Sequence, residues 1–194
     1  MTDALLVSWT SQPFVLAVLF AWGFGEAVAL PIVPDVLLGL LALATPAALG
    51  LPLVAAIAGA IVGATALARL QRRRPDVVKK IIAIQPGLGR RGMEEARARI
   101  EREGAVRGFA QVGPGLPLKA YVVTLIDLSG DPGLARLGGL TLVNRLTRLV
   151  PVVAVFALAG IVARAAGVSV SSAIPTYVVG WTLFYLAFWW VRRG

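Results

Sequence analysis

The sequence contains no cysteine and no histidine among its 194 residues. The lack of cysteine excludes disulfide bonds and thiol catalysis, and the lack of histidine excludes histidine metal sites and a Ser-His-Asp triad. A response to pH near neutrality would therefore need a carboxylate or a lysine whose pKa is displaced by burial. We expect neither a bound metal nor a cofactor.

Charged residues are almost missing from the first third of the chain. Between Phe14 and Ala68 the only ones are Glu26 and Asp35, and the whole chain is 58% hydrophobic with a mean hydropathy of +0.80. This apolar stretch is much longer than the roughly 20 residues that span a bilayer. It predicts an all-α integral membrane protein. Residues 1–8 hold no basic residue, so we expect no cleaved signal peptide there.

Positive charge, in contrast, is concentrated in one segment. The net charge is +9, and residues 71–107 hold eleven Lys/Arg against five Asp/Glu. An excess of lysine and arginine between membrane spans marks the cytoplasmic side, and such a segment also attracts anionic lipid headgroups. We therefore interpret residues 71–104 as a basic cytoplasmic loop and not as a nucleic-acid-binding region.

Two similar proline motifs interrupt the apolar stretches, 83 residues apart. The first is Pro31-Ile32-Val33-Pro34-Asp35, and the second is Pro114-Gly115-Leu116-Pro117-Leu118-Lys119. Proline breaks a helix, and an ionisable residue at membrane depth is costly unless it lines a protected cavity. Interrupted helices in corresponding positions of two halves indicate a transporter binding site. We predict two hairpin tips, with Pro31, Pro34, Pro114, Gly115 and Pro117 at the turns.

The order of the apolar segments predicts a single membrane domain, residues 1–194, built as an inverted repeat. The first repeat is a re-entrant hairpin plus a helix (residues 14–70), and the second, of opposite orientation, covers residues 105–165. A C-terminal transmembrane helix (173–194) ends in aromatic residues and arginines, which are typical of the cytoplasmic interface. The fold is thus two oppositely oriented re-entrant hairpins plus about three transmembrane helices. We expect a multi-pass protein of the cell inner (plasma) membrane with a cytoplasmic C-terminus.

Glycine patterns give three further predictions. Gly59 and Gly63 lie one turn apart on a stripe of small residues, which allows a helix to pack closely within the monomer or in a dimer. We favour the monomer and leave a homo-oligomer open. Residues 87–92 match G-x-G-x-x-G without a surrounding βαβ unit, so we interpret them as a turn between two surface helices. Gly104 is expected to end the second of these helices.

These motifs, in this order, resemble those of the DedA family, also called the SNARE-associated or VTT-domain family. Phe24-Gly25-Glu26 and the first proline motif through Gly39 resemble its acidic first hairpin. Residues 113–119 resemble its second hairpin motif, and Asn144-Arg145-Leu146-Thr147-Arg148 resembles the arginine-rich start of the following helix. The resemblance covers residues 14–167.

The resemblance implies two facing hairpins and a role in moving lipids between leaflets. Bacterial members are implicated in returning undecaprenyl phosphate or in flipping phospholipids with the proton gradient, and eukaryotic members scramble phospholipids. Two acidic positions of the family fall on Glu26 and Asp35. An arginine pair of better-studied members falls on Gln111 and Pro117, neither of which is basic, so this sequence departs from the family there.

The embedded charges are the candidate site residues. Glu26 and Asp35 are the candidates for transport and for carrying protons, because desolvation favours a neutral carboxylic acid. Lys119, Arg145 and Arg148 are the candidates for binding a phosphate headgroup, because a guanidinium group matches phosphate. A second interpretation is a buried network of these charges that only holds the hairpins together. The two arginines could also extend to the cytoplasmic interface.

We predict a membrane lipid transporter of the flippase or scramblase type, and not an enzyme. Its cargo would be a phosphate-bearing lipid such as a phospholipid or undecaprenyl phosphate, its partners membrane lipids with anionic headgroups, and protons the candidate coupling ion. The alternatives are a membrane-embedded lipid-phosphate enzyme and a membrane adaptor that recruits partners through its basic loop. The missing histidine disfavours the enzyme, because such enzymes usually need a histidine or a metal-binding carboxylate cluster.

Overall fold

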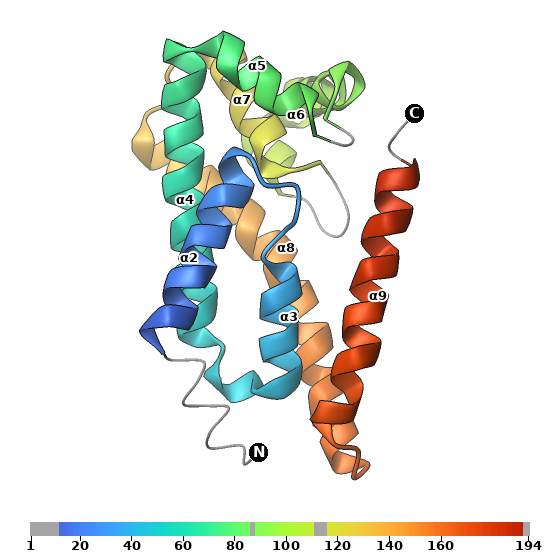
Figure 1. The fold of residues 1–194 in the computed structure, drawn as a ribbon. Coiled ribbons are helices and arrows are strands. Elements are labelled where there is room, and N and C mark those ends of the chain that lie inside the picture. The colour runs from blue at the N-terminus through green and yellow to red at the C-terminus, as the bar shows by residue number, and fades with distance from the viewer. Residues whose placement is uncertain (1–11, 86–87, 111–115, 192–194) are drawn as a thin grey trace.

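The computed structural model describes residues 12–85, 88–110 and 116–191. This part of the chain is all-helical (Figure 1), which confirms the all-α class predicted from the sequence. The helices are α2 (Pro13–Val28), α3 (Asp35–Ala44), a short 3-10 helix η1 (Pro46–Ala48), α4 (Gly50–Arg73), α5 (Pro75–Ala83), α6 (Arg90–Phe109), α7 (Leu118–Ser129), α8 (Leu134–Ala165) and α9 (Val170–Val191).

The first proline motif interrupts the first apolar segment as predicted. α2 ends at Val28, α3 begins at Asp35, and residues 29–34 between them are not helical. Proline lacks the backbone N–H that a continuing helix needs, which is why the helix stops here. α2 and α3 run in opposite directions, so their outer ends lie at the same end of the molecule (Figure 1). We call residues 29–34 the hairpin tip.

α2 packs against α4 along a seam of glycines. A Cβ atom on Gly59 would lie 2.0 Å from the carbonyl oxygen of Phe20, and a Cβ atom on Gly63 would lie 2.5 Å from that of Phe24. Only glycine permits so close an approach of two backbones. The stripe of small residues therefore packs within the chain, as the sequence predicts.

A second close approach joins α8 to the far end of α3. A Cβ atom on Gly160 would lie 2.2 Å from the carbonyl oxygen of Leu43. Arg164, one turn further along α8, donates from Nη1 to the carbonyl oxygens of Leu43 and Ala44 at 3.3 and 3.1 Å. These carbonyl groups belong to the last turn of α3, where they have no partner within the helix.

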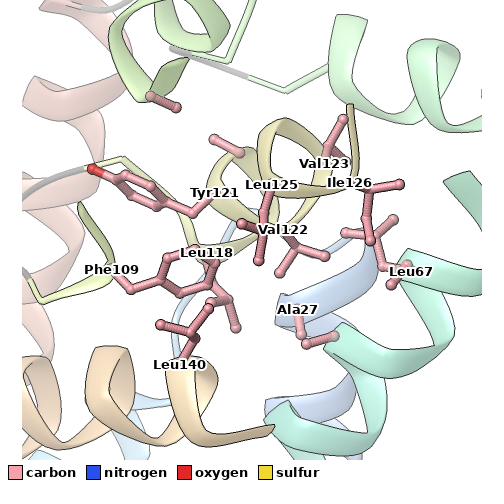
Figure 2. Close-up of a cluster of buried hydrophobic side chains, with 14 of the residues drawn as sticks. Ala27, Leu67, Phe109, Leu118, Tyr121, Val122, Val123, Leu125, Ile126 and Leu140 are labelled. Carbon is pink, nitrogen blue, oxygen red and sulfur yellow. The ribbon is translucent and has the colours of Figure 1, made fainter. Parts of the chain in front are cut away.

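α7 lies at the centre of the larger hydrophobic core. All residues from Leu118 to Ile126 are buried. They pack against side chains of α2, α4, α6 and α8, among them Ala27, Leu67, Phe109 and Leu140 (Figure 2). A helix covered on all sides is normally apolar on every face. The single charge in this stretch, Lys119, therefore needs polar partners inside the core.

The second predicted hairpin is described only in part. α6 ends at Phe109, Pro117 occupies the N-cap position of α7, and α7 begins at Leu118. A new helix thus starts directly after the second proline motif. Gln111, Pro114 and Gly115 lie outside the described residues.

The basic segment, predicted as a loop with two surface helices, contains α5 and α6. α5 buries Val78 and Ile82 and exposes Lys79 and Lys80, which is the pattern of a helix lying on a surface. α6 changes direction at Gly104, whose φ is +79°. That backbone conformation favours glycine. The predicted end of the helix is therefore a kink, and α6 continues to Phe109.

A short turn joins α7 to α8. The Gly133 N–H donates to Oδ1 of Asp131 at 3.0 Å, and Arg72 at the end of α4 forms an ion pair with the same carboxylate. The backbone hydrogen bond and the guanidinium group lower the pKa of Asp131 below its ordinary value of 3.8. This turn therefore ties the start of α8 to the end of α4.

Two of the described helices, α4 and α8, are long and apolar enough to cross a membrane, judged by length and composition. α8 differs from a soluble core helix because only 11% of its apolar window is buried. α9 likewise exposes large apolar side chains, among them Leu183, Leu186 and Trp190. It covers most of the segment predicted at 173–194, and residues 192–194 lie outside the described part.

Candidate functional site

Five charged side chains lie inside the protein around the hairpin tip. They are Glu26 on α2, Asp35 at the start of α3, Lys119 at the start of α7, and Arg145 and Arg148 on α8. Glu26, Asp35, Lys119 and Arg145 are at most 3% exposed, and the side chain of Arg148 is 13% exposed. A buried charge is costly unless it is paired and hydrogen-bonded, so the partners of each group decide what the site can do.

Glu26 and Arg145 form a fully buried ion pair that joins α2 to α8. Nη2 of Arg145 donates to Oε2 of Glu26. The pair leaves polar atoms unused, because Oε1 of Glu26 and Nε and Nη1 of Arg145 have no hydrogen-bond partner among the described residues. Buried donors without partners are costly. Arg145 can therefore bind a further acceptor without giving up Glu26.

Asp35 and Arg148 form the second ion pair. Nε of Arg148 lies 3.2 Å from Oδ2 of Asp35. Asp35 is the first residue of α3, where the positive end of the helix dipole also stabilises a carboxylate. Arg148 follows Arg145 by three residues, so both side chains lie on one face of α8. Both arginines thus point to carboxylates inside the protein.

Lys119 connects the two proline motifs. Its Nζ donates to the carbonyl oxygen of Leu30 at 2.7 Å and to Oε1 of Gln85 at 2.6 Å. Leu30 directly precedes Pro31, and Lys119 follows Pro117 by two residues, so motifs 83 residues apart in the sequence are in contact. Both of these acceptors are neutral. The charges of Glu26 and Arg145 act on the ammonium group at longer range.

Side chains satisfy the backbone groups that the interrupted helix leaves open. Backbone groups outside a helix have no helical partners and need others. The contacting side chains belong to α2, α7 and α9 and to Gln85, which follows α5. The contacts are Trp22 Nε1 to Ile32 O (2.9 Å), Gln85 Nε2 to Ala29 O, Lys119 Nζ to Leu30 O (2.7 Å) and Val33 N to Tyr185 Oη (3.0 Å). Tyr177 Oη also donates to the carbonyl oxygen of Val36 in the first turn of α3 (2.5 Å).

Asn144 binds a backbone carbonyl group at the end of α6. Its Nδ2 donates to the carbonyl oxygen of Phe109 at 2.8 Å, and the side chain is buried. Phe109 is the last residue of α6, where backbone carbonyl groups lack helical partners. The face of α8 that carries Asn144 and Arg145 therefore holds the first hairpin and the end of α6 together.

The buried charges do not balance. The cluster contains three cations and two carboxylates, and the excess is positive. No group of three or more acidic residues that could hold a metal ion occurs in the part of the chain that the structure describes. The chemistry of the cluster therefore suits an anion better than a metal cation.

The structure places all five predicted charges around the hairpin tip, but it pairs them in a way that the sequence does not reveal. Lys119 contacts the tip backbone and Gln85, and both carboxylates pair with arginines of α8. Sequence reasoning misses Gln85, Tyr177 and Tyr185. The one available signal for Gln85 is a lone amide directly after the apolar run 81–84.

Comparisons of the chain with protein-family models, with curated proteins and with solved structures found no match. No relative therefore supports the DedA resemblance or a lipid-transport role. The geometry and charge of the buried cluster are the basis for a functional conclusion.

Proposed function

We propose that the chain is a multi-pass membrane protein that moves a phosphate-bearing lipid between leaflets, in the manner of a flippase or scramblase. Membrane insertion is supported by the length and composition of α4 and α8. It is also supported by the many large apolar side chains that α8 and α9 expose, such as Val155, Leu158 and Leu183. Soluble monomers rarely expose contiguous apolar surface of this extent.

In this proposal the basic end of the molecule, where α4 ends at Arg73 and α5 and α6 begin, faces the cytoplasm. α4 and α8 cross the bilayer in opposite directions, and the two hairpins enter from opposite faces as an inverted repeat. The contact between Lys119 and Leu30 supports this arrangement, because it joins the second proline motif to the residue that precedes the first. Sites of this type lie near the midplane, where interrupted helices meet.

The observation that carries the proposal is the excess of positive charge in the buried cluster. Arg145 is 0% exposed and still has two nitrogen atoms without hydrogen-bond partners among the described residues. A phosphate group would supply both the missing negative charge and the missing acceptors, and charge-assisted hydrogen bonds of this type are the strong ones. Undecaprenyl phosphate and phospholipids both present such a group, and the DedA resemblance favours them.

The carboxylates give the proposal a route for protons. Glu26 and Asp35 each keep one oxygen without a hydrogen-bond partner among the described residues. Protonation of Glu26 would remove the negative charge beside Arg145, and that guanidinium would then attract a headgroup more strongly. Proton binding and headgroup binding would then favour each other, because both act on the same arginine.

The test is a leaflet-exchange assay in proteoliposomes with a labelled phospholipid or polyprenyl phosphate. Arg145→Lys keeps the charge but loses guanidinium donors, and we expect exchange to slow by about tenfold or more, since a buried hydrogen bond to a charged group is worth about 1.5–3 kcal/mol. Arg136→Lys is the matched control, because Arg136 is exposed on the same helix. Exchange no faster than in protein-free liposomes would refute the proposal, and chemical conversion of the lipid would indicate an enzyme.

A further inference from the structure

Gln85 joins three segments at the hairpin tip. It follows α5 and Ile84, and its side chain is buried although the adjacent Ile84 is exposed. Its amide nitrogen donates to the carbonyl oxygen of Ala29, and its amide oxygen accepts from Nζ of Lys119 at 2.6 Å. One side chain therefore holds both the end of α2 and the ammonium group at the start of α7.

Within the described residues, Lys119 donates hydrogen bonds to neutral acceptors only. The ammonium group donates to the carbonyl oxygen of Leu30 and to the Gln85 amide. Glu26, the carboxylate whose charge acts on it, is already bonded to Arg145. A phosphate oxygen carries a negative charge that the Leu30 carbonyl and the Gln85 amide lack, so it adds a Coulomb attraction to the hydrogen bond. A phosphate bound at Arg145 would therefore compete well for the ammonium group.

We propose that Gln85 is a positioning residue for the headgroup site, a role that rests on the proposed function. It keeps the Lys119 ammonium group on the carbonyl end of α2 until a phosphate arrives at Arg145. The ammonium group then moves to the phosphate, and the hairpin tip loses its bond at Leu30. We call the Gln85–Lys119–Leu30 contact the latch, because headgroup binding opens it and tip release follows.

The other partners of the tip explain why release is local. Trp22 and Tyr185 still hold the backbone of Ile32 and Val33 after the latch opens. The four-carbon lysine stem is flexible, so rotation of the side chain can redirect the ammonium group. Loss of one hydrogen bond to a charged group shifts the ratio of released to latched tip by about ten- to a hundred-fold.

The absence of native cysteine allows a single reporter at the tip. Leu30 is 46% exposed and its carbonyl oxygen is the acceptor in the latch, so Leu30→Cys can carry a spin label whose mobility is read by electron paramagnetic resonance. The probes are a short-chain phosphatidic acid and the matching diacylglycerol, which differ only in the phosphate. We expect the phosphatidic acid to raise the mobility of the label and the diacylglycerol to leave it unchanged.

Two replacements of Gln85 separate positioning from a merely structural role, because they act in opposite directions. Gln85→Met removes the acceptor of the ammonium group, so the label is expected to be mobile before lipid is added. Both replacements lose the amide donor to the Ala29 carbonyl, so they differ in what they offer to Lys119. Gln85→Glu offers it a carboxylate, so the label is expected to stay immobile with phosphatidic acid present. Gln71→Met is the matched control, since Gln71 bonds Asp127 at 2.8 Å, and it should respond as the reporter alone does.

Circular dichroism of each variant checks folding, and the thermal shift with phosphatidic acid checks binding. Binding without any change of label mobility would overturn the latch while leaving the proposed function intact. A shift of mobility in the same direction in Gln85→Met and Gln85→Glu would overturn it as well. If phosphatidic acid neither shifts the unfolding midpoint nor is exchanged between leaflets, the proposed function fails. Opposite shifts in the two variants, with a lipid response in the reporter and in Gln71→Met, are the expected result.

Discussion

Breaking the Glu26–Arg145 pair tests how the site is built. Glu26→Gln keeps the shape of the side chain and removes its charge, which leaves the fully buried guanidinium of Arg145 without a counter-charge. Removing one partner of a buried ion pair costs about 3–5 kcal/mol, because the remaining charge is stranded away from water. We expect Glu26→Gln and Arg145→Met each to lower the free energy of unfolding by about that amount.

The double variant with Glu26→Gln and Arg145→Met is expected to recover most of this loss. Both charges are then removed together, and replacing a whole buried pair is often neutral, so we expect a free energy of unfolding within about 2 kcal/mol of the unmodified chain. Glu101→Gln is the control, because it breaks the exposed Arg97–Glu101 pair on α6 and should cost only about 0.3–0.5 kcal/mol.

Circular dichroism in mixed micelles with increasing denaturing detergent measures these free energies. The reasoning fails if the double variant is as unstable as the two single losses added together, since the two groups would then not act as a pair. It also fails if Glu26→Gln costs no more than Glu101→Gln.

Lipid exchange by the same double variant separates the two interpretations of the cluster. If the charges only hold the hairpins together, exchange should return along with stability. If Arg145 binds the headgroup, the double variant should be folded and still fail to exchange lipid, which is the result we expect.

Three further predictions concern the fold. Gly59→Ala should lower the free energy of unfolding by about 1–3 kcal/mol, because its Cβ would lie 2.0 Å from a backbone carbonyl oxygen. Gly139→Ala has no atom within 4 Å of its Cβ and should be neutral or stabilising by up to about 1 kcal/mol. Denaturation in detergent compares the two variants. Tyr185→Phe removes the acceptor of a tip amide, so hydrogen exchange should accelerate at the tip and stay unchanged in α4; equal rates would contradict the tip contact. The pKa of Asp131 is lowered, so the contribution of this carboxylate to stability is complete above pH 3.8, its ordinary pKa, and is lost as the pH falls below that value. Asp131→Asn should remove that part of the acid dependence of the unfolding midpoint. An unchanged pH profile would refute the assignment.

Features with a local physical cause are predictable from the sequence. The interruption at residues 29–34 follows from two prolines, and the change of direction in α6 follows from Gly104. The close packing of Gly59 and Gly63 follows from the spacing of small residues, and the structure confirms that it lies within the chain. These outcomes depend on the chemistry of a few neighbouring residues.

The pairing of the charges is not predictable in this way. Glu26 and Arg145 are 119 positions apart, and their contact depends on how α8 is rotated against α2. A helical spacing of three places Arg145 and Arg148 on one face, but it does not say whether that face points to the core or to an interface. Gln85 is missed for the same reason, because a polar residue at a helix end is usually exposed and only the tertiary fold shows its burial.

The glycine contacts attach the two arms of the first hairpin to two different units, α2 with α4 and α3 with α8. Gly59 and Gly63 lock α2 onto α4, whereas Gly160 locks the end of α3 onto α8, so neither arm can slide along its neighbour. If the two units separate, the chain must bend in the six-residue connection 29–34. The Asp35–Arg148 pair then stays intact, because both residues belong to the same unit. The Glu26–Arg145 pair spans the boundary, so parting the units must break that bond first.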